Sequence, residues 1–241
     1  MKRILLSITV FLLVLPARAK NDSICDFSVG ADFVSSYVWR GMMLSRPSVQ
    51  PAMDLQAGGF SIGAWGSVEM TGYGYKEVDL TASYTVNNLK IGLFNYWVSW
   101  DGNYNYFDFS ESTAHLLEAF LEYSFDPFPL TVGWNTIIAG DDKYLDKNGK
   151  AKRAFSTYLE VRYAFQIKDV QLETAVGASP WRSSTLYTYD GGRTDRFAVI
   201  NLSLMASKDI KINDRYSLGI FSQLIINPAK EDAFFVFGIK F

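Results

Sequence analysis

The amino-acid sequence predicts an all-β fold: a closed, antiparallel transmembrane β-barrel of about 12 strands that follows an N-terminal signal peptide. Three observations lead to this prediction. Apolar and polar residues alternate over segments of strand length, which is the pattern of a strand with two different faces. The connections between these segments are alternately short and long. Aromatic residues make up 16% of the 241 residues, with 18 Phe, 14 Tyr and 6 Trp, which is more than a soluble domain of this size needs.

The N-terminus has the organisation of a secretory signal peptide. Basic residues are followed by an apolar run at residues 4–15 and then by the small-x-small pattern Ala17-Arg18-Ala19. The run is shorter than the ~20 residues that a transmembrane helix needs, which makes an uncleaved N-terminal anchor the weaker alternative. We expect a signal peptide at residues 1–19 and one barrel domain at residues 20–241.

The strands are predicted from the alternation, in order along the chain. In residues 78–86 every even position is apolar or aromatic, and residues 155–165 place charged side chains opposite an apolar face. The C-terminus repeats the pattern, because Phe235, Phe237 and Phe241 share one face. Most segments are long enough to cross a hydrocarbon layer at the tilt of a membrane barrel, whereas strands of soluble sandwiches have about 5–6 residues. The expected strands lie at about residues 27–40, 47–57, 59–69, 75–86, 89–100, 113–125, 129–140, 154–166, 170–180, 196–207, 214–226 and 233–241.

The lengths of the connections depend on the parity of the strand before them. Apart from the tenth, the connections after even-numbered strands are short, at Gly58, Asn87-Asn88, 126–128 and 167–169. Long connections follow odd-numbered strands, at 101–112, 141–153 and 181–195. Short turns at one end and long loops at the other are typical of bacterial outer-membrane barrels. If the last strand ends at the periplasm, an even number of strands places the short turns there and the long loops outside.

The alternation also assigns side chains to lipid or lumen. Lipid offers no hydrogen-bond partners, so every strand edge must be paired and the apolar face must point outward. This parity predicts the lumen-facing charged residues Asp32, Arg40, Glu77, Asp79, Glu118, Glu122, Glu160, Arg162 and Glu173, with Arg40 near the extracellular rim. The aromatic girdles at the two membrane interfaces are expected to include Tyr37, Trp39, Trp97, Trp100 and Trp134. A secreted β-sandwich or lipocalin-like protein with aromatic residues in its core is the alternative.

A β-bulge reverses the parity of every residue beyond it. Asn95 falls on the predicted lipid face, which marks the strand at residues 89–100 as one place for such a bulge.

The N-terminal part of the barrel domain also resembles a known family. The segments Ser36-Tyr37-Val38-Trp39-Arg40-Gly41, Arg46-Pro47-Ser48-Val49-Gln50-Pro51 and Gly59-Phe60-Ser61-Ile62-Gly63-Ala64-Trp65-Gly66-Ser67 look like the opening of the TorF-like porin family. The resemblance covers roughly residues 27–69 well and the rest only in its general barrel pattern. It implies a bacterial outer-membrane β-barrel, and it supplies no ligand residues.

The composition argues against several other functions. A net charge of −2 leaves no basic patch for nucleic acid. One Cys and one His exclude a disulfide framework and most metal sites, and we expect no metal and no cofactor. The single His, His115, is predicted on the lipid side near the outer rim. Residues 141–149 resemble half of a calcium loop that lacks its terminal Glu.

We therefore expect a porin-like channel, not an enzyme, in the outer membrane of a Gram-negative bacterium. Small hydrophilic solutes would diffuse through it, with a mild preference for cations that is due mainly to Glu118, Glu122 and Glu160, and with Arg162 as a local partner of Glu160. A structural or envelope-interaction barrel with a lumen filled by side chains is one alternative, and a barrel enzyme acting on lipid or peptide is another. The expected partners are outer-membrane lipid, small hydrophilic solutes and the barrel assembly machinery, for which the terminal Phe241 would be the signal; nucleic acid is not expected.

Overall fold

The computed structural model describes residues 25–241 except 73, 100–104, 111–112, 185–186 and 188–195. The expected signal peptide at residues 1–19 and the girdle residue Trp100 lie outside the described residues. Among the described residues, no helix has the length and apolar character that crossing a membrane requires.

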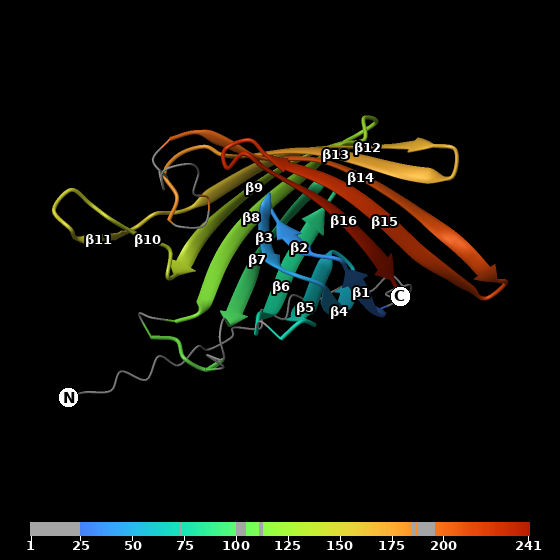
Figure 1. Ribbon diagram of the computed structural model, residues 1–241, viewed down its shortest axis with the longest axis horizontal. Coiled ribbons are helices and arrows are strands. Elements are labelled where there is room, and N and C mark those ends of the chain that lie inside the picture. The colour runs from blue at the N-terminus through green and yellow to red at the C-terminus, as the bar shows by residue number, and fades with distance from the viewer. Residues whose placement is uncertain (1–24, 73, 100–104, 111–112, 185–186, 188–195) are drawn as a thin grey trace.

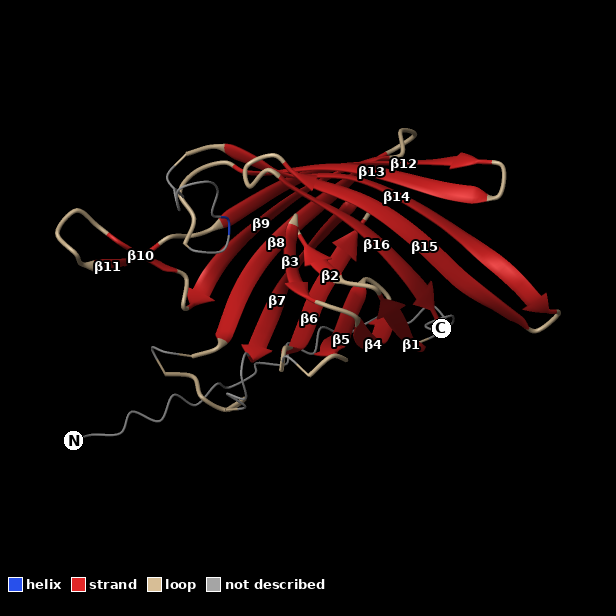
Figure 2. Cartoon of the chain, in the orientation of Figure 1, coloured by secondary structure: helices blue, strands red, loops and turns tan. Residues whose placement is uncertain are grey.

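Twelve strands of the described chain form a closed antiparallel barrel, as the alternation predicted (Figures 1 and 2). Consecutive strands pair along the sheet, and β1 closes the barrel against the last strand, β16. Closure pairs the strands around the whole wall, which is the arrangement that removes free sheet edges. The wall consists of β1 (Asp26–Val34), β4 (Ser48–Ala57), β5 (Phe60–Glu69), β6 (Lys76–Val86), β7 (Leu89–Ser99), β8 (His115–Phe125), β9 (Leu130–Gly140), β12 (Thr157–Ile167), β13 (Val170–Ser179), β14 (Ala198–Asn213), β15 (Tyr216–Asn227) and β16 (Asp232–Lys240).

The two ends of the barrel differ in their connections. The end with the two- to four-residue turns, called the turn end below, carries 58–59, 87–88, 126–129, 168–169 and 214–215. The opposite end, called the loop end, carries one four-residue turn at 228–231 and five longer connections, of which the longest lie at 100–114, 141–156 and 180–197. The connection after the tenth strand is therefore short as well, because β14 continues to Asn213 where the sequence predicted an end at residue 207.

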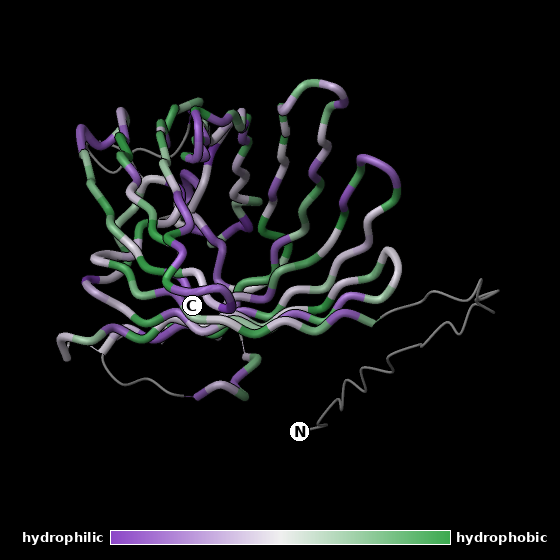
Figure 3. Tube along the Cα trace, turned by 90° about the vertical axis from the view of Figure 1, so that its right-hand side faces the viewer, coloured by the Kyte–Doolittle hydropathy of each residue, from purple (hydrophilic) through white to green (hydrophobic). Residues whose placement is uncertain are grey.

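Hydrophobic and hydrophilic residues alternate along the strands (Figure 3). The outward positions carry exposed apolar side chains such as Val29, Leu93 and Phe237, whereas inward acidic side chains such as Glu77 and Glu118 are buried. The wall thus has an apolar outer face and a polar, charged lumen.

The main departure from the prediction lies between β1 and β4. The strand expected at residues 27–40 ends at Val34, and a hairpin of β2 (Tyr37–Trp39) and β3 (Met42–Ser45) follows (Figure 1). Its turn residues Arg40 and Gly41 have φ of 49° and 77°, the positive values of a two-residue hairpin turn. We call this segment, residues 37–45, the inner hairpin.

The tip of the inner hairpin lies against strands on another part of the wall. The Asn227 side chain donates a hydrogen bond of 3.0 Å to the Gly41 carbonyl. A Cβ on Gly41 would lie 1.9 Å from the Ile200 carbonyl oxygen, so the close approach to β14 requires glycine. The inner hairpin therefore crosses the inside of the barrel.

Candidate functional site

The inner hairpin places a buried ion pair inside the lumen. Arg40, at its tip, donates two hydrogen bonds to the Glu118 carboxylate on β8, at 2.7 and 2.8 Å. The side chains are 10% and 0% exposed. Tyr96 also donates to Glu118, at 2.7 Å, and Arg40 contacts the Tyr187 hydroxyl. Two-point pairing with further hydrogen bonds is the geometry that compensates buried charges.

Aromatic rings surround the Arg40 guanidinium. Its central carbon lies 4.4 Å from the centre of the Trp39 ring and 4.5 Å from that of Tyr158, within cation–π range. Tyr158 is held by a 2.6 Å hydrogen bond to Glu160 and by the amide of Asn201. We call this group the Arg40 constriction; it consists of Arg40, Glu118, Trp39, Tyr96, Tyr158 and Tyr187.

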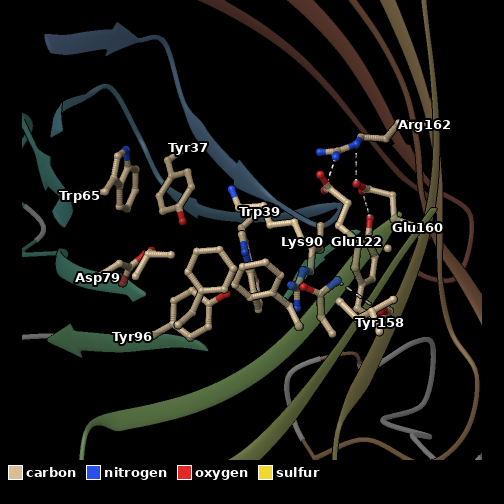
Figure 4. Close-up of a pocket in the computed structure, with 17 residues that line it drawn as sticks. Tyr37, Trp39, Trp65, Asp79, Lys90, Tyr96, Glu122, Tyr158, Glu160 and Arg162 are labelled. Carbon is tan, nitrogen blue, oxygen red and sulfur yellow. Dashed lines mark hydrogen bonds and ion pairs between the residues drawn. The ribbon is translucent and has the colours of Figure 1, made fainter. Parts of the chain in front are cut away.

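A cavity of about 540 Å³ lies beside the constriction within the lumen (Figure 4). It extends to Lys90, the second residue of β7, and thus toward the turn end. Arg162 contacts Glu122 and lies 3.6 Å from Glu160, which forms a second charged group on the cavity wall. The Arg162 and Glu122 side chains are about one-third exposed and that of Glu160 about one-fifth, so water reaches this group more readily than the constriction.

A third charged group lies on β6 and contains two acids. Tyr75 donates a hydrogen bond to Glu77, and the Glu77 and Asp79 carboxyl groups hydrogen-bond to each other. Asp79 lines the cavity, and its Oδ1 atom has no hydrogen-bond partner. These acids have no basic ion-pair partner among the described residues.

The structure thus separates the predicted lumen residues into groups. Arg40 and Glu118 form the constriction, Glu122, Glu160 and Arg162 form the second group, and Glu77 and Asp79 form the third. Asp32 lies opposite Lys240 at the β1–β16 closure, and Glu173 lines a separate cavity of about 280 Å³. Arg162 lies beside Glu160, as the sequence predicted, and it also pairs with Glu122, while Arg40 pairs with Glu118. The three acids expected to favour cations therefore each have a basic neighbour.

Two girdle predictions are wrong. Tyr37 and Trp39 lie inside the barrel, where Tyr37 packs 5.2 Å from Trp65 and Trp39 packs 5.7 Å from Tyr96. The parity of the first strand does not extend to these residues, because the chain leaves the wall after Val34.

The other predicted girdle residues that the structure describes, Trp97 and Trp134, lie on the outer side. Trp97 is buried there beneath Tyr106, and Trp134 is exposed and contacts Trp181. Phe241 is exposed, and its backbone pairs with that of Ala31 across the barrel closure.

His115 lies on the outer side of the wall and is covered by the loop that precedes β8. Its Nδ1 lies 2.9 Å from Asn95 Oδ1 and its Nε2 lies 2.6 Å from the Tyr106 carbonyl oxygen. β7 pairs with both neighbours without a register shift, so the bulge considered near Asn95 is absent. The outward polar side chain of Asn95 contacts His115 instead.

The acids of the loop-end segment 141–156 stabilise that loop. Asp142 accepts hydrogen bonds from the backbone and the hydroxyl of Ser156. The N–H of Lys150, the ammonium of Lys152 and the N–H of Asn148 hold the pKa of Asp146 below its usual value. These contacts account for the acids that resembled half of a calcium loop.

Sequence reasoning missed three residues of the Arg40 constriction. Tyr96 and Tyr158 fall on the inward parity of their strands, so the alternation could have identified them. Tyr187 belongs to the long loop at 180–197, and no periodicity places it in the lumen.

Comparison with solved structures finds a porin of similar fold. The NanC porin aligns with 88% of this chain and 98% of its own, at 9% identity and a TM-score of 0.53. An outer-membrane channel from Pseudomonas putida F1 aligns with 94% of this chain and 98% of its own, at 13% identity and a TM-score of 0.42. No curated protein sequence matches the chain. A family model described as a bacterial protein of unknown function, Gcw_chp, matches residues 18–192. The chain belongs to the Gcw_chp family.

Proposed function

We propose that this protein is an outer-membrane channel through which small hydrophilic solutes diffuse. The observation that carries the proposal is the charged cavity of about 540 Å³ inside a closed barrel with an apolar outer face. Closed barrels satisfy every backbone polar group internally, which lipid requires of a spanning structure. The likeness of the fold to the NanC porin agrees with this proposal.

In this proposal the turn end faces the periplasm and the loop end faces outward. Short turns at the periplasmic side and long loops outside are the usual arrangement of such barrels. The Arg40 constriction would then lie between the outer loops and the cavity. Its buried ion pair would set the narrowest passage, and a narrow charged passage favours ions of one sign.

A structural barrel with a closed lumen is the second candidate. The inner hairpin favours it, because residues 37–45 lie across the inside of the barrel and are held by Glu118 and Asn227. The two candidates differ in whether solutes pass this hairpin. An enzyme finds less support, since the oxygens of Asn95 and Tyr106 contact both ring nitrogens of His115.

Planar-bilayer recording separates the two candidates. We expect small, steady single-channel currents from the unmodified barrel, and larger currents from Arg40→Gln, which releases the tip of the inner hairpin from Glu118. Glu173→Gln is the matched control, because Glu173 lines a different cavity, and we expect its currents to be unchanged.

The absence of current has a meaning only for folded barrels. Folding is first verified for each variant by the shift in gel mobility between unheated and boiled samples. If folded barrels of the unmodified protein and of Arg40→Gln carry no current, the channel proposal is wrong and the closed structural barrel stands.

A further inference from the structure

Asp79 lines the cavity, its side chain is 7% exposed, and its Oδ1 atom has no hydrogen-bond partner. Glu77 and Asp79 hydrogen-bond to each other, which two carboxyl groups do only by sharing a proton, and Glu77 supplies no positive charge. A buried acid without a basic partner is neutralised by a proton, and a bound cation can take the place of that proton.

Aromatic side chains surround this carboxylate. Trp65 and Tyr96 are the direct cross-strand neighbours of Asp79 on β5 and β7, and such neighbours on one face contact each other. Tyr37 of the inner hairpin packs on Trp65 with 5.2 Å between the ring centres. Figure 4 shows these four side chains together at one end of the cavity, away from Arg162 and Glu160. We call them the Asp79 cage.

The same combination already holds a cation elsewhere in this chain. At the Arg40 constriction, a carboxylate and two aromatic rings surround a guanidinium. The Asp79 cage repeats this arrangement of acid and rings without a cation supplied by the chain.

The described basic side chains on the cavity wall are engaged or distant. Arg40 pairs with Glu118, and Arg162 contacts Glu122 and Glu160. Lys90 is six residues from Tyr96 along β7, roughly 20 Å at the rise of a β-strand. The charge that Asp79 can bind must therefore come from a solute.

We propose that the Asp79 cage binds an alkylammonium cation, which displaces the proton shared with Glu77 into the water of the lumen, so that the Asp79 carboxylate supplies the charge and the three rings supply the walls. Aromatic faces attract ammonium groups, and the attraction increases where water is excluded. Alkyl substituents on the nitrogen add apolar contact with the rings, which a hydrated metal ion does not offer. The site goes beyond the proposed diffusion channel, since it holds one class of solute at equilibrium.

Isothermal titration calorimetry of the folded barrel in detergent micelles tests the proposal, with choline as the probe. The neutral isostere 3,3-dimethyl-1-butanol has the same shape without the charge. We expect saturable binding of choline and at least ten times weaker binding of the isostere. Asp79→Asn and Trp65→Leu are each expected to weaken choline binding about tenfold, which corresponds to ~1.4 kcal/mol. Glu173→Gln, which lies in the other cavity, is expected to leave it unchanged.

Three results overturn the proposal: no saturable choline binding by the folded unmodified barrel, equal binding of choline and its isostere, or unchanged binding in Asp79→Asn. Equal binding would identify an apolar cavity only. The measurement does not depend on conduction. A barrel that binds choline but carries no current supports the Asp79 cage and contradicts the channel. A barrel that carries current but does not bind choline supports the channel and contradicts the Asp79 cage.

Discussion

Burial distinguishes the two lumen ion pairs at the scale of single residues. Glu118 is fully buried beside Arg40, whereas Glu122 and Arg162 are each about one-third exposed. Removing one partner of a buried pair leaves an uncompensated charge and costs ~3–5 kcal/mol, while a partly solvated pair contributes ~1 kcal/mol or less. The two pairs have the same chemistry, but only at the partly exposed Glu122–Arg162 pair can water solvate a charge that has lost its partner.

We expect Glu118→Gln and Arg40→Gln each to lower the free energy of unfolding by about 3 kcal/mol. The double variant is expected to lose less than the sum of the two, because neither charge is then left alone. Denaturant unfolding in micelles, followed by tryptophan fluorescence, measures all three variants. Glu122→Gln is the control, with an expected change below about 1 kcal/mol. Additive losses for the two single substitutions would show that Arg40 and Glu118 are not coupled.

At the scale of secondary-structure elements, the inner hairpin is the part of the fold that the sequence pattern did not predict. The wall was predictable because each strand has a lumen-facing and a lipid-facing side, so polar and apolar residues alternate with a period of two. Tyr37 and Trp39 continue the apolar positions of that period and Arg40 falls on the polar side, so the local pattern predicts that they belong to the wall. The turn at Arg40-Gly41 depends on positive φ at both residues and on contacts with Ile200 and Asn227, which lie more than 150 positions away in sequence. Long-range contacts of this kind leave no periodic signal.

Gly41→Ala tests whether the inner hairpin is held by this close approach. A Cβ at Gly41 meets the Ile200 carbonyl, and we expect faster hydrogen exchange across residues 37–45. Gly149→Ala is a matched control, because Gly149 has a similar φ of 72° but open space around its Cβ position. The control is expected to cost about 1 kcal/mol from backbone strain alone, without a change in the inner hairpin. Similar exchange in both variants would mean that the contact with Ile200 does not hold the tip.

Closure of the barrel joins its first and last strands, so it is a property of the whole molecule. β1 and β16 share three register pairs, whereas β15 and β16 share nine. The Phe241 backbone extends the closure by two hydrogen bonds with Ala31, at 3.0 and 3.2 Å. The alternation of apolar and polar residues predicted the last strand. The small number of register pairs at the closure follows from the stagger between the first and last strands, which the alternation does not encode.

Deleting Phe241 is expected to lower the fraction of chains that fold into heat-modifiable barrels in cells. Two backbone hydrogen bonds, each worth ~1 kcal/mol, are then lost from the shortest strand pairing of the barrel wall. Phe241→Leu keeps the backbone pairing and removes the ring. If the ring is the assembly signal, both variants assemble poorly in cells, and Phe241→Leu still refolds in micelles. Normal assembly of both variants would contradict a role for Phe241.

The charge distribution of the whole lumen determines the expected ion selectivity. We propose a mild cation preference, measured as a reversal potential across a salt gradient in planar bilayers. Glu118→Gln is expected to shift the potential toward anions, because it leaves the Arg40 charge uncompensated where water is excluded and the interaction is strongest. Glu122→Gln is expected to shift it less, since Arg162 remains beside Glu160 and both are partly solvated. Anion preference in the unmodified protein would overturn the proposed selectivity, and equal shifts in the two variants would mean that the Arg40 constriction is not the selective passage.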